Sequence, residues 1–272
     1  MTITIPHRPC PNCGARSAKK TLEWSGFNQY EIWGDAPDSL KLEIARCKDC
    51  GMVYAINSDE VDMSNDKFIH HRPAKEPVPA PSPRLDYHRA QLNMLKPYIP
   101  AGARVLDYGA GFCNFLRAAR ERGYEVEGIN PIRYAAEWAG RVLDIEVHPV
   151  FGMDFETDKR YDLIVSDMTF EHLVNPRGNF AKIRNLLAVD GVAYIEVPNW
   201  HTIKRLRRGV DCLKDPTHYN YFTPTTLADM AQREGFQVIR KAPTVGRSPA
   251  RKILKSIVNA LGIGTCSVLL KR

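Results

Sequence analysis

Residues 105–116 read VLDYGAGFCNFL, and this stretch decides the fold. A short apolar run leads to Asp107, glycines follow at positions 109 and 111, and a segment with helical character comes after them. Glycines let a ligand approach the backbone closely, and the amide groups at a helix start favour an electron-rich ligand group. The stretch therefore predicts a buried strand, a ligand-binding loop and a helix in that order.

The loop suits one class of nucleotide ligand better than another. A dinucleotide fingerprint, G-x-G-x-x-G, would place its third glycine where this chain has Asn114, so the close helix packing near a diphosphate is lost. Asp107 would repel a diphosphate but attract a ligand that carries an ammonium and a sulfonium group. We therefore expect Asp107, Gly109 and Gly111 to bind S-adenosylmethionine (SAM) rather than a nicotinamide cofactor.

Four further segments after the loop also match motifs of one known enzyme family, in the same order along the chain. They are 128–131 (GINP), 161–167 (YDLIVSD), 170–173 (FEHL) and 187–199 (LAVDGVAYIEVPN). With the loop, they resemble the class I SAM-dependent methyltransferases from about Leu85 to Arg272. The resemblance implies an α/β fold in which a Rossmann-like, seven-stranded sheet carries helices on both faces and has an antiparallel last strand.

Hydrophobic periodicity along this part of the chain alternates between helix and strand, which predicts a mostly parallel sheet with its ligand at the carboxyl ends of the strands. A helix is expected over 84–98, with Leu85, His88, Leu92 and Leu95 on one side. The elements expected after it are strand 104–108, helix 112–122, strand 124–129, helix 132–142, strands 145–148 and 161–166, helix 176–188, strand 191–197, helix 224–234, and strands 236–241 and 265–270.

The resemblance also implies where the rest of the cofactor lies. Its members usually carry an acidic residue after the second strand that accepts both ribose hydroxyls, but this chain has Asn130. An amide offers no bidentate charge, which leaves weaker binding or a modified cofactor open. The other cofactor-side candidates are Pro131, Ile132, Met153, Asp154 and Phe155 near the adenine, and Asp167 and Met168 near the methionine end.

Two histidines are candidates for the acceptor side. The segment with Glu171 and His172 leaves the fourth strand at the mouth of the expected cleft, and we interpret His172 as a positioning residue more than as a base. His218 lies in an aromatic segment, and a histidine there accepts a hydroxyl proton at neutral pH. We take His218 as the general base, with a purely structural hydrogen bond to the loop as the alternative.

Two matched cysteine pairs lie near the N-terminus. Cys10 and Cys13, like Cys47 and Cys50, flank a turn and are followed by glycine. Four thiolates are the number that a closed tetrahedral zinc site requires. The 33 residues between the pairs include strand-like stretches at 21–24, 29–33 and 40–45. We expect a zinc-bound β ribbon over 1–57, with free thiols or a redox pair as the alternative, and with a structural role for the zinc.

A proline-rich linker is expected over 58–83, ahead of a methyltransferase domain at 84–272. His70 and His71 lie in this linker and are taken as solvated, because four cysteines already fill the metal site. The remaining cysteines lack partners at ligand spacing and are expected to be small buried side chains; they are Cys113, Cys212 and Cys266.

Composition limits the remaining possibilities. No apolar run approaches the ~18 to 20 residues of a membrane span, and no signal-like segment opens the sequence, so we expect a cytoplasmic protein with reduced thiols. The net charge of +7 permits anionic partners without requiring them. A basic amphipathic stretch at 247–261 suits packing against the sheet or a second subunit, or else peripheral contact with an anionic membrane. The oligomeric state is left open.

The leading hypothesis is methyl transfer from SAM to an oxygen or nitrogen of a small polar acceptor. The resemblance is to methyltransferases of bacterial sugar and polysaccharide pathways, which implies a sugar or nucleotide-sugar. An rRNA or tRNA base methyltransferase is one alternative; stacking residues near the cysteines come with little charge, which disfavours nucleic acid. A non-catalytic SAM-fold protein is another, supported by Asn130.

A cationic run could hold a diphosphate or form a solvated helical face: Lys204, Arg205, Arg207 and Arg208.

Overall fold

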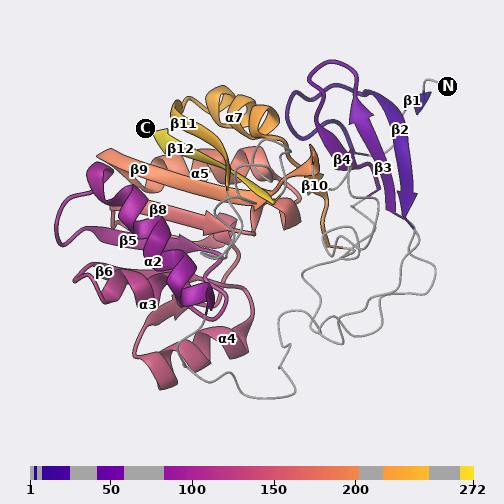
Figure 1. Cartoon of the computed structure of the whole chain (residues 1–272). Helices are drawn as coiled ribbons and strands as arrows, with labels where there is room; N and C mark the ends of the chain where they lie inside the picture. Colours follow the sequence, from indigo (N-terminus) through magenta and orange to yellow (C-terminus); the bar gives the residue numbers. More distant parts are fainter. Residues whose placement is uncertain (1–2, 5–7, 25–41, 58–82, 202–216, 245–263) are drawn as a thin grey trace.

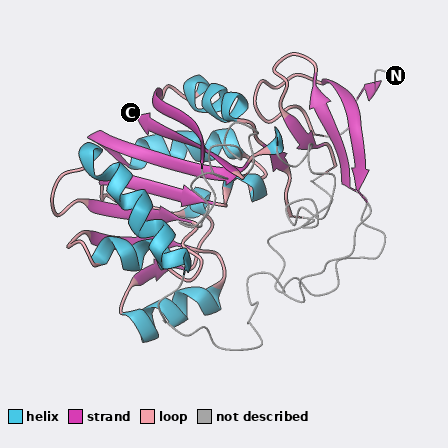
Figure 2. Ribbon diagram, in the orientation of Figure 1, coloured by secondary structure: helices cyan, strands magenta, loops and turns pink. Residues whose placement is uncertain are grey.

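Two sheets lie next to each other in the protein (Figures 1 and 2). The structure, a computed structural model, describes residues 3–4, 8–24, 42–57, 83–201, 217–244 and 264–272. The larger sheet has seven strands in the order β11-β12-β9-β8-β5-β6-β7, and the smaller sheet has five in the order β1-β2-β3-β4-β10. Outside the described residues lie the expected strand at 29–33, His70 and His71, the cations at 204–208, Cys212 and the stretch 247–261.

The larger sheet has the expected strand order and direction. Strands β5 to β9 pair in parallel, whereas β12 runs antiparallel to both of its neighbours, β9 and β11. This arrangement confirms the α/β fold class and the antiparallel last strand. The strands are β5 (Arg104–Tyr108), β6 (Glu125–Ile129), β7 (Glu146–His148), β8 (Tyr161–Asp167), β9 (Leu187–Pro198), β11 (Gln237–Thr244) and β12 (Thr265–Lys271).

Strand alternation places helices on both faces of this sheet. Val105 and Leu163 pack with the helices on one face, whereas the next residues along, Leu106 and Ile164, pack with those on the other. The first face carries α2 (Pro83–Leu95), α3 (Asn114–Arg120) and α4 (Arg133–Trp138); the second carries α5 (Pro176–Leu186) and α7 (Pro224–Arg233).

Helix boundaries differ from the sequence expectation for local reasons. Helix α3 begins later because Cys113, just before it, has φ 58° and so lies in the left-handed region. Helix α4 ends at Trp138 and continues as a π-helical turn over Ala139–Leu143. Helix α5 ends early enough for β9 to begin at Leu187. Helix α7 starts at a capping box, in which Thr223 and Thr226 satisfy each other's backbone amides.

The smaller sheet is built mainly from the N-terminal segment. Its strands are β1 (Ile3–Thr4), β2 (Ser17–Trp24), β3 (Leu42–Cys47), β4 (Val53–Ala55) and β10 (Asn220–Tyr221), all paired antiparallel. Strand β10 was not expected. It comes from the far end of the chain, and it sets Tyr221 opposite Val53 in the register. We call residues 8–24 and 42–57 the N-terminal module.

The N-terminal module shares a core with the larger sheet. One continuous cluster of buried side chains joins Met52 and Tyr54 of the module to Phe222 and Leu227. At the edge of this cluster, the buried Asn12 donates through Nδ2 to Asp229 Oδ2 at 2.8 Å. The module is therefore packed onto the sheet through side chains as well as through strand pairing.

Smaller expectations can be checked directly. Helix α2 buries Leu85, His88, Leu92 and Leu95, as its spacing predicted, and Gln91 as well. Cys113 and Cys266 are fully buried. Among the described residues, the structure contains no helix with the length and apolarity that a membrane crossing requires.

Candidate functional site

A cavity of about 400 Å³ opens beyond the carboxyl ends of β5 and β6. This is the position in which an open parallel sheet binds its ligand. We call the lining that follows β5, β6 and β7 the donor wall; it consists of Tyr108, Gly109, Gly111, Ile129, Asn130, Pro131, Ile132, Phe151, Gly152 and Met153. The opposite lining follows β8 and consists of Met168, Thr169, His172, Leu173, Val174 and Asn175, with Asn179 of α5.

The glycine loop of the donor wall needs both of its glycines. Gly109 has φ +109°, and a Cβ there would lie 2.1 Å from Thr169 Oγ1. Gly111 has φ +50° with open space around it, so its requirement is conformational. Cys113 and Met168 near the cavity also have left-handed φ values, 58° and 56°. Unfavourable backbone conformations of this kind persist where the surrounding structure enforces them, and they concentrate at ligand sites.

Asn130 links two loops of the donor wall. Its Nδ2 donates to the Gly111 carbonyl at 3.2 Å, and its Oδ1 accepts from the Ile132 amide at 3.0 Å. A carboxylate could accept the second bond but could not donate the first. The amide therefore has a positive structural reason to occupy this position, which the sequence comparison with the usual acidic residue did not reveal.

Two carboxylates lie beneath the loop. Asp107 and Asp167 end β5 and β8 under helix α2, and neither is among the residues that line the cavity. Burial, reinforced by the charge of Asp167, raises the pKa of Asp107 to about 8, and the Arg84 guanidinium opposes the shift. Asp167 lies 3.9 Å from Arg84 Nη2 and 3.8 Å from His88 Nε2. Asp107 is therefore mostly protonated at neutral pH, and its carboxyl group lies next to the glycine loop.

Only some of the residues expected near the adenine line the cavity. Met153 lies in the cavity lining, together with Pro131 and Ile132, but Asp154 and Phe155 do not. Asp154 is exposed, and Phe155 is buried against the His148 ring, with the ring centroids 4.9 Å apart. Phe151 and Gly152 occupy the lining in their place.

Opposite the donor wall, Glu171, His172 and His218 form a cluster. Each brings one oxygen or nitrogen to within 4.8 Å of the others, and the two imidazole centroids are 4.5 Å apart. His172 lines the cavity, whereas His218 packs behind it. The His172 Nδ1 lies 2.8 Å from Thr217 Oγ1 and 3.2 Å from the Thr217 carbonyl. Because a carbonyl only accepts, the proton of a neutral His172 is favoured on Nδ1, which makes Nε2 the proton-accepting nitrogen.

The loop that carries His218 is held by distant segments. The Tyr219 amide donates to the Glu171 carbonyl, and the Ala55 amide of the N-terminal module donates to the Tyr219 carbonyl, both at 2.8 Å. The Asn220 side chain donates to the carbonyls of Phe170 and Leu173 at 3.0 and 2.7 Å. We call Glu171, His172 and the segment 217–222 the acceptor wall.

Glu196 is a further buried carboxylate that sequence reasoning missed. It is 1% exposed, and it accepts from Gln91 Nε2 at 2.8 Å and from Tyr194 Oη at 2.8 Å. Tyr87 Oη and Thr265 Oγ1 also donate to it. Charge-assisted bonds of this number stabilise a buried carboxylate. Here they tie α2 to the end of β9, beside Asp167; no sequence signal joins donors so far apart.

The four N-terminal cysteines meet at one point. Cys10 Sγ lies 3.5 Å from Cys50 Sγ, and Cys13 Sγ lies 3.6 Å from Cys47 Sγ. A disulfide requires about 2 Å, whereas sulfurs around a tetrahedral zinc at ~2.3 Å lie roughly 3.8 Å apart. Gly14 and Gly51 adopt φ +77° and +75°, and their amides turn back to the carbonyls of Cys10 and Cys47. The cluster thus fits a single metal ion.

Known proteins share both sequence features and the fold of this chain. A family model described as a methyltransferase domain matches residues 84–241, which is more than half of the chain. The chain belongs to the methyltransferase domain family. No curated protein matches its sequence. As a member of this family, it is an enzyme, and SAM is the cofactor of its fold.

Solved structures agree on the fold. A SAM-dependent methyltransferase from Mesorhizobium loti has a TM-score of 0.55 at 18% identity, over 69% of this chain and 100% of its own. One from Archaeoglobus fulgidus has a TM-score of 0.53 at 19% identity, over 69% and 94%. A complex between the Trm112 methyltransferase activator and a methyltransferase of Haloferax volcanii scores 0.55 at 15% identity, over 68% and 90%. The methyltransferase fold thus covers about two thirds of the chain.

Proposed function

We propose that this methyltransferase acts on an oxygen or nitrogen of a small polar acceptor, a sugar or nucleotide-sugar. The observation that carries the proposal is the cavity between the donor wall and His172. It has room for an elongated small ligand, and the one imidazole in its lining among the described residues, that of His172, lies across from the glycine loop. A histidine at that place suits a hydroxyl or amine that must lose a proton as it attacks.

The donor wall has the chemistry to hold SAM. Gly109 and Gly111 expose backbone to the cavity, Pro131, Ile132 and Met153 offer apolar surface, and the carboxyl groups of Asp107 and Asp167 lie beneath the loop. SAM supplies a positively charged sulfonium with a transferable methyl group. The protein aligns the acceptor with that group and excludes water, which is the larger part of the work in such a transfer.

On the acceptor wall, we assign the proton transfer to His172 Nε2. Thr217 fixes the ring through Nδ1, and Glu171 Oε1 lies 4.0 Å from Nε2, where its charge stabilises the imidazolium that forms. His218 then holds the His172 ring by edge contact. This exchanges the roles that the sequence suggested for the two histidines, because His172 and not His218 lines the cavity.

For the cysteine cluster, we propose a structural zinc ion. Four thiolates fill a tetrahedral shell, so no coordination position is left for a substrate. The N-terminal module is small, and modules of this size rarely fold without a metal. The zinc would thus act indirectly, by keeping β4 in place against the loop that carries His218.

Two titrations and one product analysis test the function. Isothermal titration with SAM and with S-adenosylhomocysteine (SAH) should show micromolar binding. Mass spectrometry after incubation with SAM and panels of sugars, nucleotide-sugars and RNA should show one added methylene unit on a sugar. SAH binding with no product in any panel would support a non-catalytic protein instead, and a methylated RNA base would support the nucleic-acid alternative. Absence of SAM and SAH binding would overturn all of these.

A further inference from the structure

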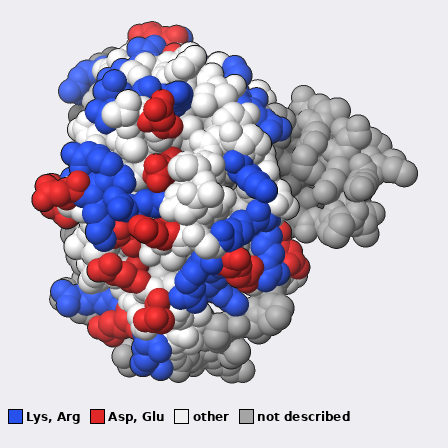
Figure 3. Space-filling model, turned by 90° about the vertical axis from the view of Figure 1, so that its left-hand side faces the viewer, with Lys and Arg blue, Asp and Glu red and all other residues white. Residues whose placement is uncertain are grey.

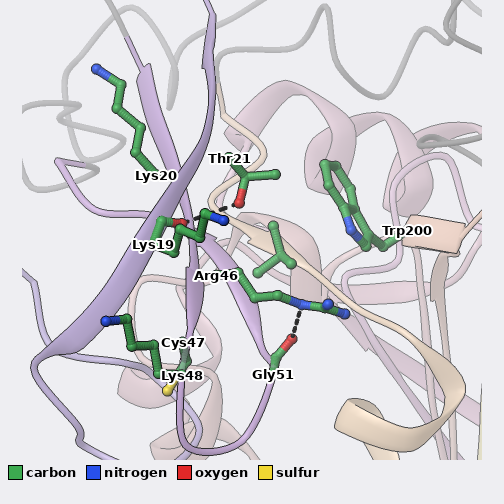
Figure 4. Close-up of a pocket in the computed structure, with 9 residues that line it drawn as sticks. Lys19, Lys20, Thr21, Arg46, Cys47, Lys48, Gly51 and Trp200 are labelled. Atoms are coloured by element: carbon green, nitrogen blue, oxygen red, sulfur yellow. Dashed lines mark hydrogen bonds between the residues drawn. The ribbon is translucent and has the colours of Figure 1, made fainter. Parts of the chain in front are cut away.

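A second cavity, of about 540 Å³, lies between the N-terminal module and Trp200. Strands β2 and β3 form one wall of it and Trp200 forms the other, with Val53 of β4 also in the lining (Figure 4). Among the residues that the structure describes, its lining includes three lysines and one arginine and no acidic residue. We call it the basic pocket.

Two cations of the basic pocket face each other across the strand pair. Lys19 and Arg46 are directly opposite in the β2–β3 register, so both side chains lie on the same face of the sheet. Figure 4 shows both of them on the side toward Trp200. Like charges in such a pair repel, and within the described parts of the chain neither one has a carboxylate within 4.0 Å. The neighbouring Lys20 differs, since it pairs with Glu43 at 3.0 Å.

Arg46 is oriented by a backbone contact. Its Nε donates to the Gly51 carbonyl at 3.3 Å, in the turn of the second cysteine pair. One edge of the guanidinium is thereby held, and its terminal nitrogens remain available to bind an anion, which guanidinium groups do in bidentate fashion. The charge of the pocket is thus partly preorganised by the metal-binding turn.

The facing wall offers an aromatic surface. Trp200 is 5% exposed and packs on Tyr221, with the ring centroids 5.2 Å apart. Its amide donates to the Phe222 carbonyl at 2.7 Å, which fixes the backbone at the end of β9. A rigid indole across from two cations suits a ligand that combines an anionic group with a planar ring.

The basic pocket and the acceptor wall share strand β4. Val53 lines the pocket, and Ala55, two residues further along, donates to the carbonyl of Tyr219, next to His218. Two strand residues span roughly 7 Å. The basic pocket and the loop that carries His218 are therefore held by the same short strand.

We propose that the basic pocket binds the phosphate groups of the acceptor, which would make the acceptor a phosphorylated small molecule, with diphosphate as the best match to Lys19 and Arg46. The proposal rests on the proposed function for its link to methyl transfer, although phosphate binding can be measured independently of it. The concave shape favours a small molecule over a nucleic acid. Figure 3 shows the left-hand side of Figure 1, away from the N-terminal module, and there basic and acidic side chains are interspersed.

The test is titration of the full chain with inorganic pyrophosphate, UDP and uridine. Pyrophosphate and UDP should bind, UDP the more tightly, and uridine should not. Lys19→Met and Arg46→Met should each weaken both phosphate ligands roughly tenfold or more. Lys96→Met, which removes an exposed cation far from the pocket in sequence and outside its lining, should leave binding unchanged.

Three results would overturn the proposal. The first is that neither pyrophosphate nor UDP binds. The second is that Lys96→Met weakens phosphate binding as much as the pocket variants do. The third is that a short RNA binds far more tightly than UDP and loses affinity in the pocket variants. The last result would assign the pocket to nucleic acid. A parallel SAH titration separates this proposal from the function, because SAH binding should be the same in all four proteins. Loss of SAH binding everywhere would instead refute the proposed function while leaving phosphate binding to be judged on its own data.

Discussion

The donor wall and the acceptor wall are assembled in opposite ways. The donor wall consists of loops that directly follow β5, β6 and β7, and Asn130 bonds to Gly111 and Ile132 within the same unit. The acceptor wall joins Glu171 and His172 to the loop 217–222, and it depends on Ala55 of the N-terminal module. From this comparison we predict that donor binding depends on the sheet alone, whereas acceptor positioning requires the module.

The largest difference in effect between the two walls is expected when one metal ligand is removed. Cys47→Ser leaves an incomplete zinc shell, and structural zinc contributes on the order of 10 kcal/mol to small modules. We expect loss of bound zinc in elemental analysis and loss of methyl transfer, with SAH affinity within about tenfold of the wild type. Cys266→Ala, which removes a buried thiol outside the cluster, should retain the zinc. If SAH binding disappears with the zinc, the walls are not separable.

His172→Gln should affect the acceptor wall alone. The amide preserves a polar side chain but cannot take up the acceptor proton, so kcat should fall by roughly 10² to 10⁴-fold. SAH affinity, measured by calorimetry, should stay unchanged. His218→Gln provides the matched control with a smaller loss, because His218 contacts the ring without lining the cavity. A larger loss in His218→Gln would restore His218 as the base.

Gly109→Ala should weaken donor binding, and its clash also reaches Thr169 of the opposite lining. The new Cβ meets Thr169 at 2.1 Å and forces alanine into φ +109°. Strain of roughly 2–3 kcal/mol corresponds to about 30- to 140-fold weaker SAH binding. Gly102→Ala is the control, since Gly102 has φ +69° with nothing within 4 Å of the added carbon and lies outside the cavity lining. Equal SAH affinity in the two variants would contradict the contact with Thr169 as the cause of weaker binding.

The pH dependence of stability should reveal Asp107. Its pKa of about 8 lies above the unfolded value, so the folded chain holds a proton that the unfolded chain releases above about pH 4. The stability from this proton is fully present below about pH 4 and is lost as pH rises to about 8. The free energy of unfolding of Asp107→Asn should therefore exceed that of the wild type between pH 5 and 8, by on the order of 1 kcal/mol or more. Melting curves without ligand measure this, and parallel curves for the two proteins would refute the shift.

The smallest effect is expected at the opposed cations of the basic pocket. Lys19→Met removes one member of a like-charged cross-strand pair, so the melting temperature without ligand should rise slightly, by the equivalent of about 0.2–1 kcal/mol. Lys20→Met is the matched control on the other face of the strand, where the ion pair with Glu43 is lost and no rise is expected. A rise in both variants would point to general charge reduction.

Sequence predicted the donor side well because its signals are local. Strand β5 and the loop with Gly109 and Gly111 occur within one dozen residues, and period-two alternation assigned Val105 and Leu106 to opposite faces. The largest error here is the shift of three to four residues from Phe155 to Gly152 and Phe151 in the lining, because a short turn does not reveal which of its side chains faces a cavity.

The acceptor side was predicted less well because its contacts are distant in sequence. Strand β10 has only two residues, and nothing in them indicates a partner at Val53. Both histidines were found, but their order from the cavity depends on how Tyr219 is held between Glu171 and Ala55. The four donors to Glu196 come from α2, β9 and β12, so no motif could have united them.

The peptide groups on either side of Tyr219 have a consequence for enzyme engineering. Its amide is bonded to the segment before α5 and its carbonyl to the N-terminal module, so one residue connects three stretches that are far apart along the chain. Replacing the loop that carries Tyr219 with the loop of a relative would break these hydrogen bonds, unless the relative also has a counterpart of β4. Exchange of acceptor preference would therefore require moving the module and the loop together as one cassette.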